Sequence, residues 1–182
     1  IYRTCLSVYD QRVLYLPTEG VNQDLLEYRL SRQTASVLDL LEHYVGNVII
    51  DVSSANLESS RKILQEADLV VVNLCQNFQL LSHFFRNFSD IQKKAFYVIG
   101  NYCEDSVITK STIAQSYHLP GSRVGTIPHN RRFADALTKG NVVSFLLRNQ
   151  NCTSDNVNYP FIQAAKETVA LLHQAIKQTA YR

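Results

Sequence analysis

The stretch Val124–Phe133 reads Val-Gly-Thr-Ile-Pro-His-Asn-Arg-Arg-Phe, and it decides the fold class that we expect for this chain. It opens with a short apolar run that ends at Pro128, as a buried strand does. A polar turn then precedes an amphipathic stretch that stops before Gly140, which predicts a helix. In an open α/β sheet, ligands bind beyond the carboxyl ends of the strands. The stretch therefore predicts a strand, a ligand-facing turn and a helix.

Four further apolar runs lie upstream: Val13–Leu16, Val48–Val52, Leu69–Leu74 and Ala95–Ile99. None alternates with polar residues, which is typical of strands covered on both faces. Amphipathic stretches of helical length separate most of these runs. Strands that alternate with helices predict a doubly wound, mostly parallel α/β sheet with helices on both faces.

The helices that we expect follow from apolar residues at helical spacing. They are Thr34–Tyr44, Leu57–Ala67, Phe78–Phe88, Ser106–Tyr117, Arg131–Lys139 and Tyr159–Thr179, and a polar loop is expected over Asn149–Asn158. The last helix carries one apolar stripe, which we expect to pack on the sheet: Phe161, Ala165, Val169, Leu172 and Ile176. A membrane-targeting role for this helix is the weaker alternative, because few basic residues accompany the stripe.

Composition limits the classes of protein. The length of 182 residues predicts a single domain, which with the alternation above is a single α/β domain over residues 1–182. The contents of 46% apolar and 19% charged residues are ordinary for a soluble globular protein. A net charge of +2 predicts no strong nucleic-acid surface. Cys5, Cys75, Cys103 and Cys152 are far apart and predict reduced, mostly buried thiols of a cytoplasmic protein. The sequence has no methionine, which favours a fragment of a longer protein.

Three polar positions follow apolar runs and are candidate ligand contacts. Asp51 ends the run Val48-Ile49-Ile50, where a carboxylate can orient the water shell of a nucleotide-bound Mg²⁺ or simply cap a helix. Asn101 follows Ala95–Gly100, and its amide offers one donor group and one acceptor to a base, or ends the strand in a turn. Pro128 and His129 would line a pocket for a nucleotide base, although His129 equally fits an exposed turn.

In this order, these stretches resemble the MinD/ParA family of deviant P-loop ATPases, over roughly Arg12 to Leu147. The resemblance implies a P-loop NTPase-like fold, Mg²⁺ near Asp51, and the adenine of ATP or ADP against Asn101, Pro128 and His129. It implies a homodimer switched by ATP that organises a division site, a DNA partition complex or a polar pilus or secretion machinery, as in the CpaE/TadZ branch. Hydrolysis would be slow, dependent on Mg²⁺ and stimulated by a partner protein. No catalytic residue can be assigned.

Two departures from the family pattern bear on this expectation. The residues after Asp51, Val52-Ser53-Ser54, lack the usual proline-containing switch, and no phosphate-binding glycine loop precedes Asp51. Such a loop supplies the backbone amides and the lysine that hold the phosphates. We therefore expect the chain to be the C-terminal portion of a larger nucleotide-binding domain.

Two alternatives stay open. The first is a degenerate, non-catalytic protein–protein interaction module on the same fold, which the missing phosphate loop favours. The second and weaker one is a receiver domain, which would need an acidic cluster after its first strand and a distal lysine. A cytoplasmic protein, or one held peripherally at the inner face of the membrane, fits each of these readings.

Overall fold

The computed structural model describes residues 6–8, 13–15, 32–33, 36, 38–41, 43–52 and 57–179. The chain divides into two compact units, Ile1–Ala67 and Asp68–Arg182. The expected α/β architecture belongs to the second unit.

The first unit differs from the sheet that the sequence predicted. Strand β2 (Val13–Tyr15) pairs antiparallel with β1 (Leu6–Val8), so the prediction that this run joins a parallel sheet is wrong, and Leu16 lies outside the described residues. Residues 47–52 have no regular secondary structure, and Ile49 is 95% exposed. The predicted strand Val48–Val52 is therefore also wrong. An apolar run becomes a strand only where a neighbour pairs with its backbone, and the structure describes no such pairing for this run.

The helices expected in the first unit are present in part. Helix α2 (Leu57–Glu66) confirms the expected helix Leu57–Ala67 to within one residue. Within the expected helix Thr34–Tyr44, residues 36 and 38–41 are helical and residues 43–44 form a turn; residues 34, 35, 37 and 42 lie outside the described residues.

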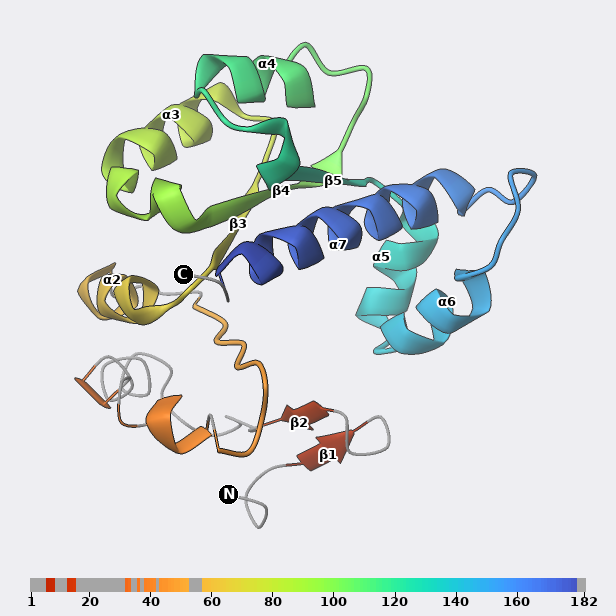
Figure 1. The fold of residues 1–182 in the computed structure, drawn as a ribbon. Helices are drawn as coiled ribbons and strands as arrows, with labels where there is room; N and C mark the ends of the chain where they lie inside the picture. The colour runs from red at the N-terminus through yellow and green to blue at the C-terminus, as the bar shows by residue number, and fades with distance from the viewer. Residues whose placement is uncertain are drawn as a thin grey trace. The chain divides into compact units, whose positions relative to one another are not determined.

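The second unit contains a parallel three-stranded sheet in the order β3-β4-β5 (Figure 1). Its strands are β3 (Val70–Leu74), β4 (Ala95–Tyr102) and β5 (Val124–Pro128). The strands predicted from Leu69–Leu74, Ala95–Ile99 and Val124–Ile127 are thus confirmed. Leu74 pairs with Ile99, and Ile99 pairs with Thr126, so the carboxyl ends of all three strands meet at one edge.

The described part of the second unit also contains five α-helices and two short 3-10 helices. The α-helices are α3 (Phe78–Asn87), α4 (Lys110–Ser116), α5 (Arg131–Thr138), α6 (Val142–Asn149) and α7 (Tyr159–Thr179), and the 3-10 helices are η1 (Ser89–Lys94) and η2 (Gly121–Arg123). Four of the α-helices match predicted ones, with α4 starting later because Thr109 caps it through the backbone N–H of Thr112. Helix α6 was not predicted; it forms a hairpin with α5.

Helices cover both faces of the sheet in the second unit. Leu81 and Phe85 of α3 and Ile113 of α4 are buried with Tyr97 and Ile99 of β4 on one face. Gly125 of β5, whose neighbour Val124 belongs to that same cluster, is closely approached by Thr168 of α7. Because successive strand residues point to opposite faces, α7 lies across the sheet from α3 and α4, as Figure 1 shows.

Helix α7 also protects the outer edge of β5. The Thr168 hydroxyl accepts a hydrogen bond from the Thr126 backbone N–H (3.0 Å) and donates one to the Thr126 carbonyl oxygen (3.0 Å). One side chain thereby satisfies the two backbone groups that a further strand would otherwise pair. The buried line of α7 consequently runs through Thr168, which is 6% exposed, whereas Val169 is 50% exposed. The prediction that Val169 belongs to the packed stripe is wrong for this reason.

The thiols are less buried than expected. Cys75 and Cys103 are exposed and Cys152 is half-buried, and all three are free; Cys5 lies outside the described residues. The prediction of mostly buried cysteines is wrong for these three, because each follows a strand or helix, where the chain returns to the surface. Across the part of the chain that the structure describes, no helix combines the length and the apolar character that crossing a membrane requires.

Candidate functional site

The candidate site lies at the carboxyl ends of β4 and β5. The imidazole Nδ1 of His129 is 2.6 Å from Oδ1 of Asn101, within hydrogen-bond distance. The backbone N–H of His129 also donates to the Tyr102 carbonyl oxygen at 3.1 Å, which extends the pairing of the two strands beyond Pro128. Asn101 and His129 are both exposed, and Pro128 is half-buried. The structure thus brings Asn101 together with Pro128 and His129, which the sequence singled out as a separate candidate.

A bulge in β4 places Asn101 at this edge. Ile99 pairs with Thr126 and Tyr102 pairs with Pro128. Between these two pairs, β4 therefore has one residue more than β5. Asn101 lies in that span with a φ of +52°, in the left-handed region that asparagine tolerates better than most residues. Bulges recur beside binding sites because they redirect a side chain. Here the residue in the bulge is Asn101, whose side chain contacts His129.

The hydrogen bond between the two side chains fixes what each one offers to a ligand. Because Oδ1 of Asn101 is an acceptor, the proton of a neutral His129 must reside on Nδ1. The Asn101 amide nitrogen then keeps its two N–H donors, and Nε2 of His129 is left as an acceptor. A donor and an acceptor therefore lie side by side on exposed groups. This arrangement suits recognition of a planar polar edge.

A network of asparagines centred on the buried Asn158 supports the turn after His129. Asn130 caps α5 by accepting from the Phe133 backbone N–H (2.8 Å), and its Nδ2 donates to Oδ1 of Asn158 (3.2 Å). Nδ2 of Asn158 in turn donates to Oδ1 of Asn149 (2.9 Å). Asn158 is only 3% exposed, so water cannot readily replace these bonds. The network ties the start of α5 to the end of α6 and the start of α7.

We expect the Asn158→Ala variant to lose about 1–2 kcal/mol of unfolding free energy, because the two partner amides would each lose a buried hydrogen bond. Urea denaturation followed by circular dichroism measures this loss. The matched control is Asn151→Ala, at an exposed turn position, which should change stability by less than about 0.5 kcal/mol. Equal stabilities of the two variants would contradict the supporting role of the network.

Gln76 provides a second support that the sequence analysis missed. Its Oε1 accepts from the Cys103 backbone N–H (2.7 Å), and its Nε2 donates to the carbonyl oxygens of Cys103 (2.9 Å) and Ile108 (2.6 Å). These hydrogen bonds of Gln76 connect the segment after β4 to the end of β3. A polar residue two positions after an apolar run was the available signal, as it was for Asn101.

Asp51, the predicted Mg²⁺ contact, belongs to the first unit, where it is exposed within the irregular segment 47–52. Its role remains a prediction from the resemblance. Among the described residues, no three His, Cys, Asp or Glu side chains are grouped so that they could hold a metal ion. Single-carboxylate contact with the water shell of a nucleotide-bound ion would not require such a group.

Comparison of the chain with protein-family models, with curated proteins and with solved structures gives no match in any of the three.

Proposed function

We propose that the chain is the C-terminal portion of a MinD/ParA-like, ATP-switched protein that organises a cellular assembly, and that Asn101, Pro128 and His129 bind its adenine. The observation that carries this proposal is the contact between Asn101 and His129 at the carboxyl ends of adjacent parallel strands. In open α/β sheets that edge is where nucleotides bind. The parallel sheet with helices on both faces is compatible with a P-loop NTPase-like fold.

The hydrogen-bonding pattern of this pair supports adenine over guanine. Adenine presents an amino donor beside a ring-nitrogen acceptor. The free N–H groups of Asn101 complement the ring nitrogen, and Nε2 of a neutral His129 complements the amino group. Guanine has a carbonyl oxygen in place of that amino group. This oxygen and Nε2 of His129 are both acceptors, so they cannot form a hydrogen bond. The proposal therefore includes a preference for ATP.

The rest of the switch follows from the resemblance and is part of the same proposal. Mg²⁺ would be bound with the nucleotide, with Asp51 acting through its water shell. Hydrolysis would proceed by in-line attack of water on the γ-phosphate, slowly in a homodimer and faster with a partner protein. The phosphate-binding loop would come from residues outside the printed sequence.

We expect Asn101→Gly in the full-length protein to weaken Mg-ATP binding about tenfold, because one hydrogen bond to the base is lost. Glycine is the sharper choice than alanine, since it retains the positive φ of this position without strain. Calorimetric titration with Mg-ATP and Mg-GTP measures both affinity and base preference. Asn151→Ala, at an exposed turn in the same unit, is the control and should bind like the wild type.

Two results would contradict the adenine site. One is tight Mg-ATP binding that Asn101→Gly leaves unchanged. The other is a full-length protein that binds neither nucleotide. The second result would favour the non-catalytic interaction module instead.

One observation supports that second candidate. Leu137 of α5 and Leu147 of α6 are 63% and 60% exposed, and Val143 and Leu146 of α6 are more than a third exposed. Exposed apolar side chains gathered on one helical hairpin are typical of surfaces that meet another protein. Sedimentation velocity with and without nucleotide separates the two candidates, because only the switch changes its oligomeric state with ATP.

A further inference from the structure

A buried hydroxyl without a partner marks a second place in the same unit. Tyr97 of β4 is 1% exposed, and among the described residues its hydroxyl is the buried side-chain polar atom that has no hydrogen bond. The rings of Phe84 and Phe85 lie near the Tyr97 ring, at centroid distances of 6.4 and 5.6 Å. Leaving a buried donor unsatisfied is costly, so nearly all such groups in proteins have a partner. The hydroxyl of Tyr97 is therefore a candidate for a ligand contact.

Tyr97 lines a cavity of about 300 Å³ at the amino end of β4. This volume lies at the lower end of the range of small-molecule sites. Lys93, His118 and Arg123 line the same cavity, and no Asp or Glu is among its lining residues. A lining with basic and no acidic side chains favours an anion.

Arg123 lies close to Tyr97 at this cavity. Arg123 is anchored by the bond from its Nη1 to the Ala95 carbonyl oxygen (3.3 Å), two residues before Tyr97. Burial raises the pKa of Tyr97 to about 12, against the opposing effect of the nearby Arg123 charge, so the hydroxyl keeps its proton at neutral pH and remains a donor. His118 adopts a φ of +52° beside the cavity, the only non-glycine residue besides Asn101 with a positive φ in the described part of the chain.

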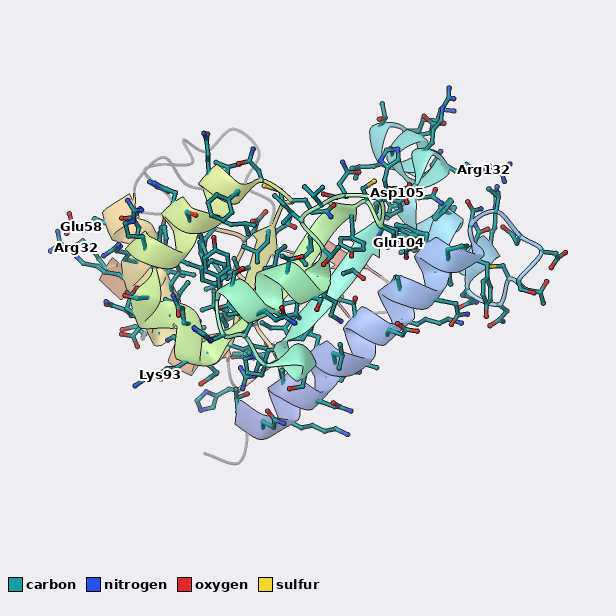
Figure 2. The ribbon with its side chains drawn as sticks, turned by 90° about the horizontal axis from the view of Figure 1, so that it is seen from above. Arg32, Glu58, Lys93, Glu104, Asp105 and Arg132 are labelled. Atoms are coloured by element: carbon teal, nitrogen blue, oxygen red, sulfur yellow. The ribbon has the colours of Figure 1, made fainter. Side chains whose placement is uncertain are left out.

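This cavity is separate from the proposed adenine site. Tyr97 and Asn101 stand near opposite ends of β4. Figure 2 shows Lys93 at the far end of the unit from Glu104 and Asp105, which follow the carboxyl end of that strand. A ligand in the cavity would therefore not compete with a nucleotide base for the same side chains.

We infer that the cavity lined by Tyr97, Lys93, His118 and Arg123 binds a small oxyanion, the phosphate or carboxylate group of a small molecule. The Tyr97 hydroxyl, which has almost no solvent-accessible surface in this structure, donates one hydrogen bond to the anion once the side chains that cover it shift. The guanidinium of Arg123 supplies charge and further donors. Leu119 and Pro120, which also line the cavity, would contact the apolar part of the molecule. This inference does not depend on the proposed ATP switch.

The test uses inorganic phosphate and acetate as probes, titrated separately into the chain at constant ionic strength with chloride as the reference. Chemical shifts of backbone amides in 92–97 and 117–123 report binding at the cavity. We expect saturable shifts with at least one probe, and the probe that gives them identifies the anion. Tyr97→Phe should weaken that binding about tenfold, the effect of one hydrogen bond to a charged group. Arg123→Gln should weaken it as well.

Two further measurements separate a ligand contact from a structural role. Without added anion, Tyr97→Phe should be at least as stable as the wild type to urea, because it removes only the unpaired hydroxyl. Tyr102→Phe, which removes a hydroxyl that accepts from the Lys110 backbone N–H, should bind the probe like the wild type. Absence of saturable shifts with both probes, or binding that Tyr97→Phe and Arg123→Gln leave unchanged, would overturn the inference.

Discussion

Replacing Gly125 with alanine is expected to lower the unfolding free energy by about 3 kcal/mol. A Cβ at this position would lie 2.6 Å from Oγ1 of Thr168, closer than such atoms approach in proteins. To relieve this overlap, α7 must move away from β5, which also breaks the two bonds between the Thr168 hydroxyl and the Thr126 backbone. Overpacking and the lost hydrogen bonds both destabilise the fold. Urea denaturation measures the difference.

Two controls make this prediction specific. Gly121→Ala adds the same methyl group where no atom lies within 4 Å, and it should change stability by less than about 1 kcal/mol in either direction. Thr168→Ala removes the atoms that Gly125→Ala would meet. In a double-mutant cycle the double variant should therefore be more stable than the sum of the two single effects predicts. Additive effects would show that Thr168 is not what excludes a side chain at Gly125.

Ile99→Ala is expected to cost about 3–4 kcal/mol. Ile99 is fully buried in the cluster that also contains Leu74, Tyr97 and Ile113, so truncation leaves a cavity among side chains that cannot easily close it. Val71→Ala on β3 is the control: Val71 is 52% exposed, and its truncation should cost less than about 1 kcal/mol. Chemical denaturation of both variants measures the two losses of unfolding free energy. Losses of similar size would contradict the assignment of Ile99 to the core.

Ile99 also bears on the candidate adenine site, because it is the last regularly paired residue of β4 before the bulge that contains Asn101. A loss of packing there should loosen the strand end. We therefore expect Ile99→Ala to weaken Mg-ATP binding in the full-length protein through Asn101, whereas Val71→Ala should leave that binding unchanged. This effect on binding follows from the proposed function, while the effect on stability does not.

The sequence by itself determined the second unit closely. Three apolar runs predicted β3, β4 and β5, and helical spacing predicted α7 from Tyr159 to Thr179. These predictions succeeded because the apolar pattern and the local caps agree with the burial that the fold provides. Asn101, Pro128 and His129 were found for a related reason: each follows or ends an apolar run, and the carboxyl ends of parallel strands meet at one edge.

The tertiary structure decided what depends on neighbours distant in the sequence. Val13–Tyr15 and Val48–Val52 have the same apolar character as β3, yet one pairs antiparallel with β1 and the other has no regular structure, because a strand is defined by its partner and not by its own residues. Thr168 replaces Val169 on the buried line of α7 because the edge of β5 needs a hydroxyl there. The unpaired hydroxyl of Tyr97 likewise became visible only once packing had enclosed it, since burial is a property of the fold.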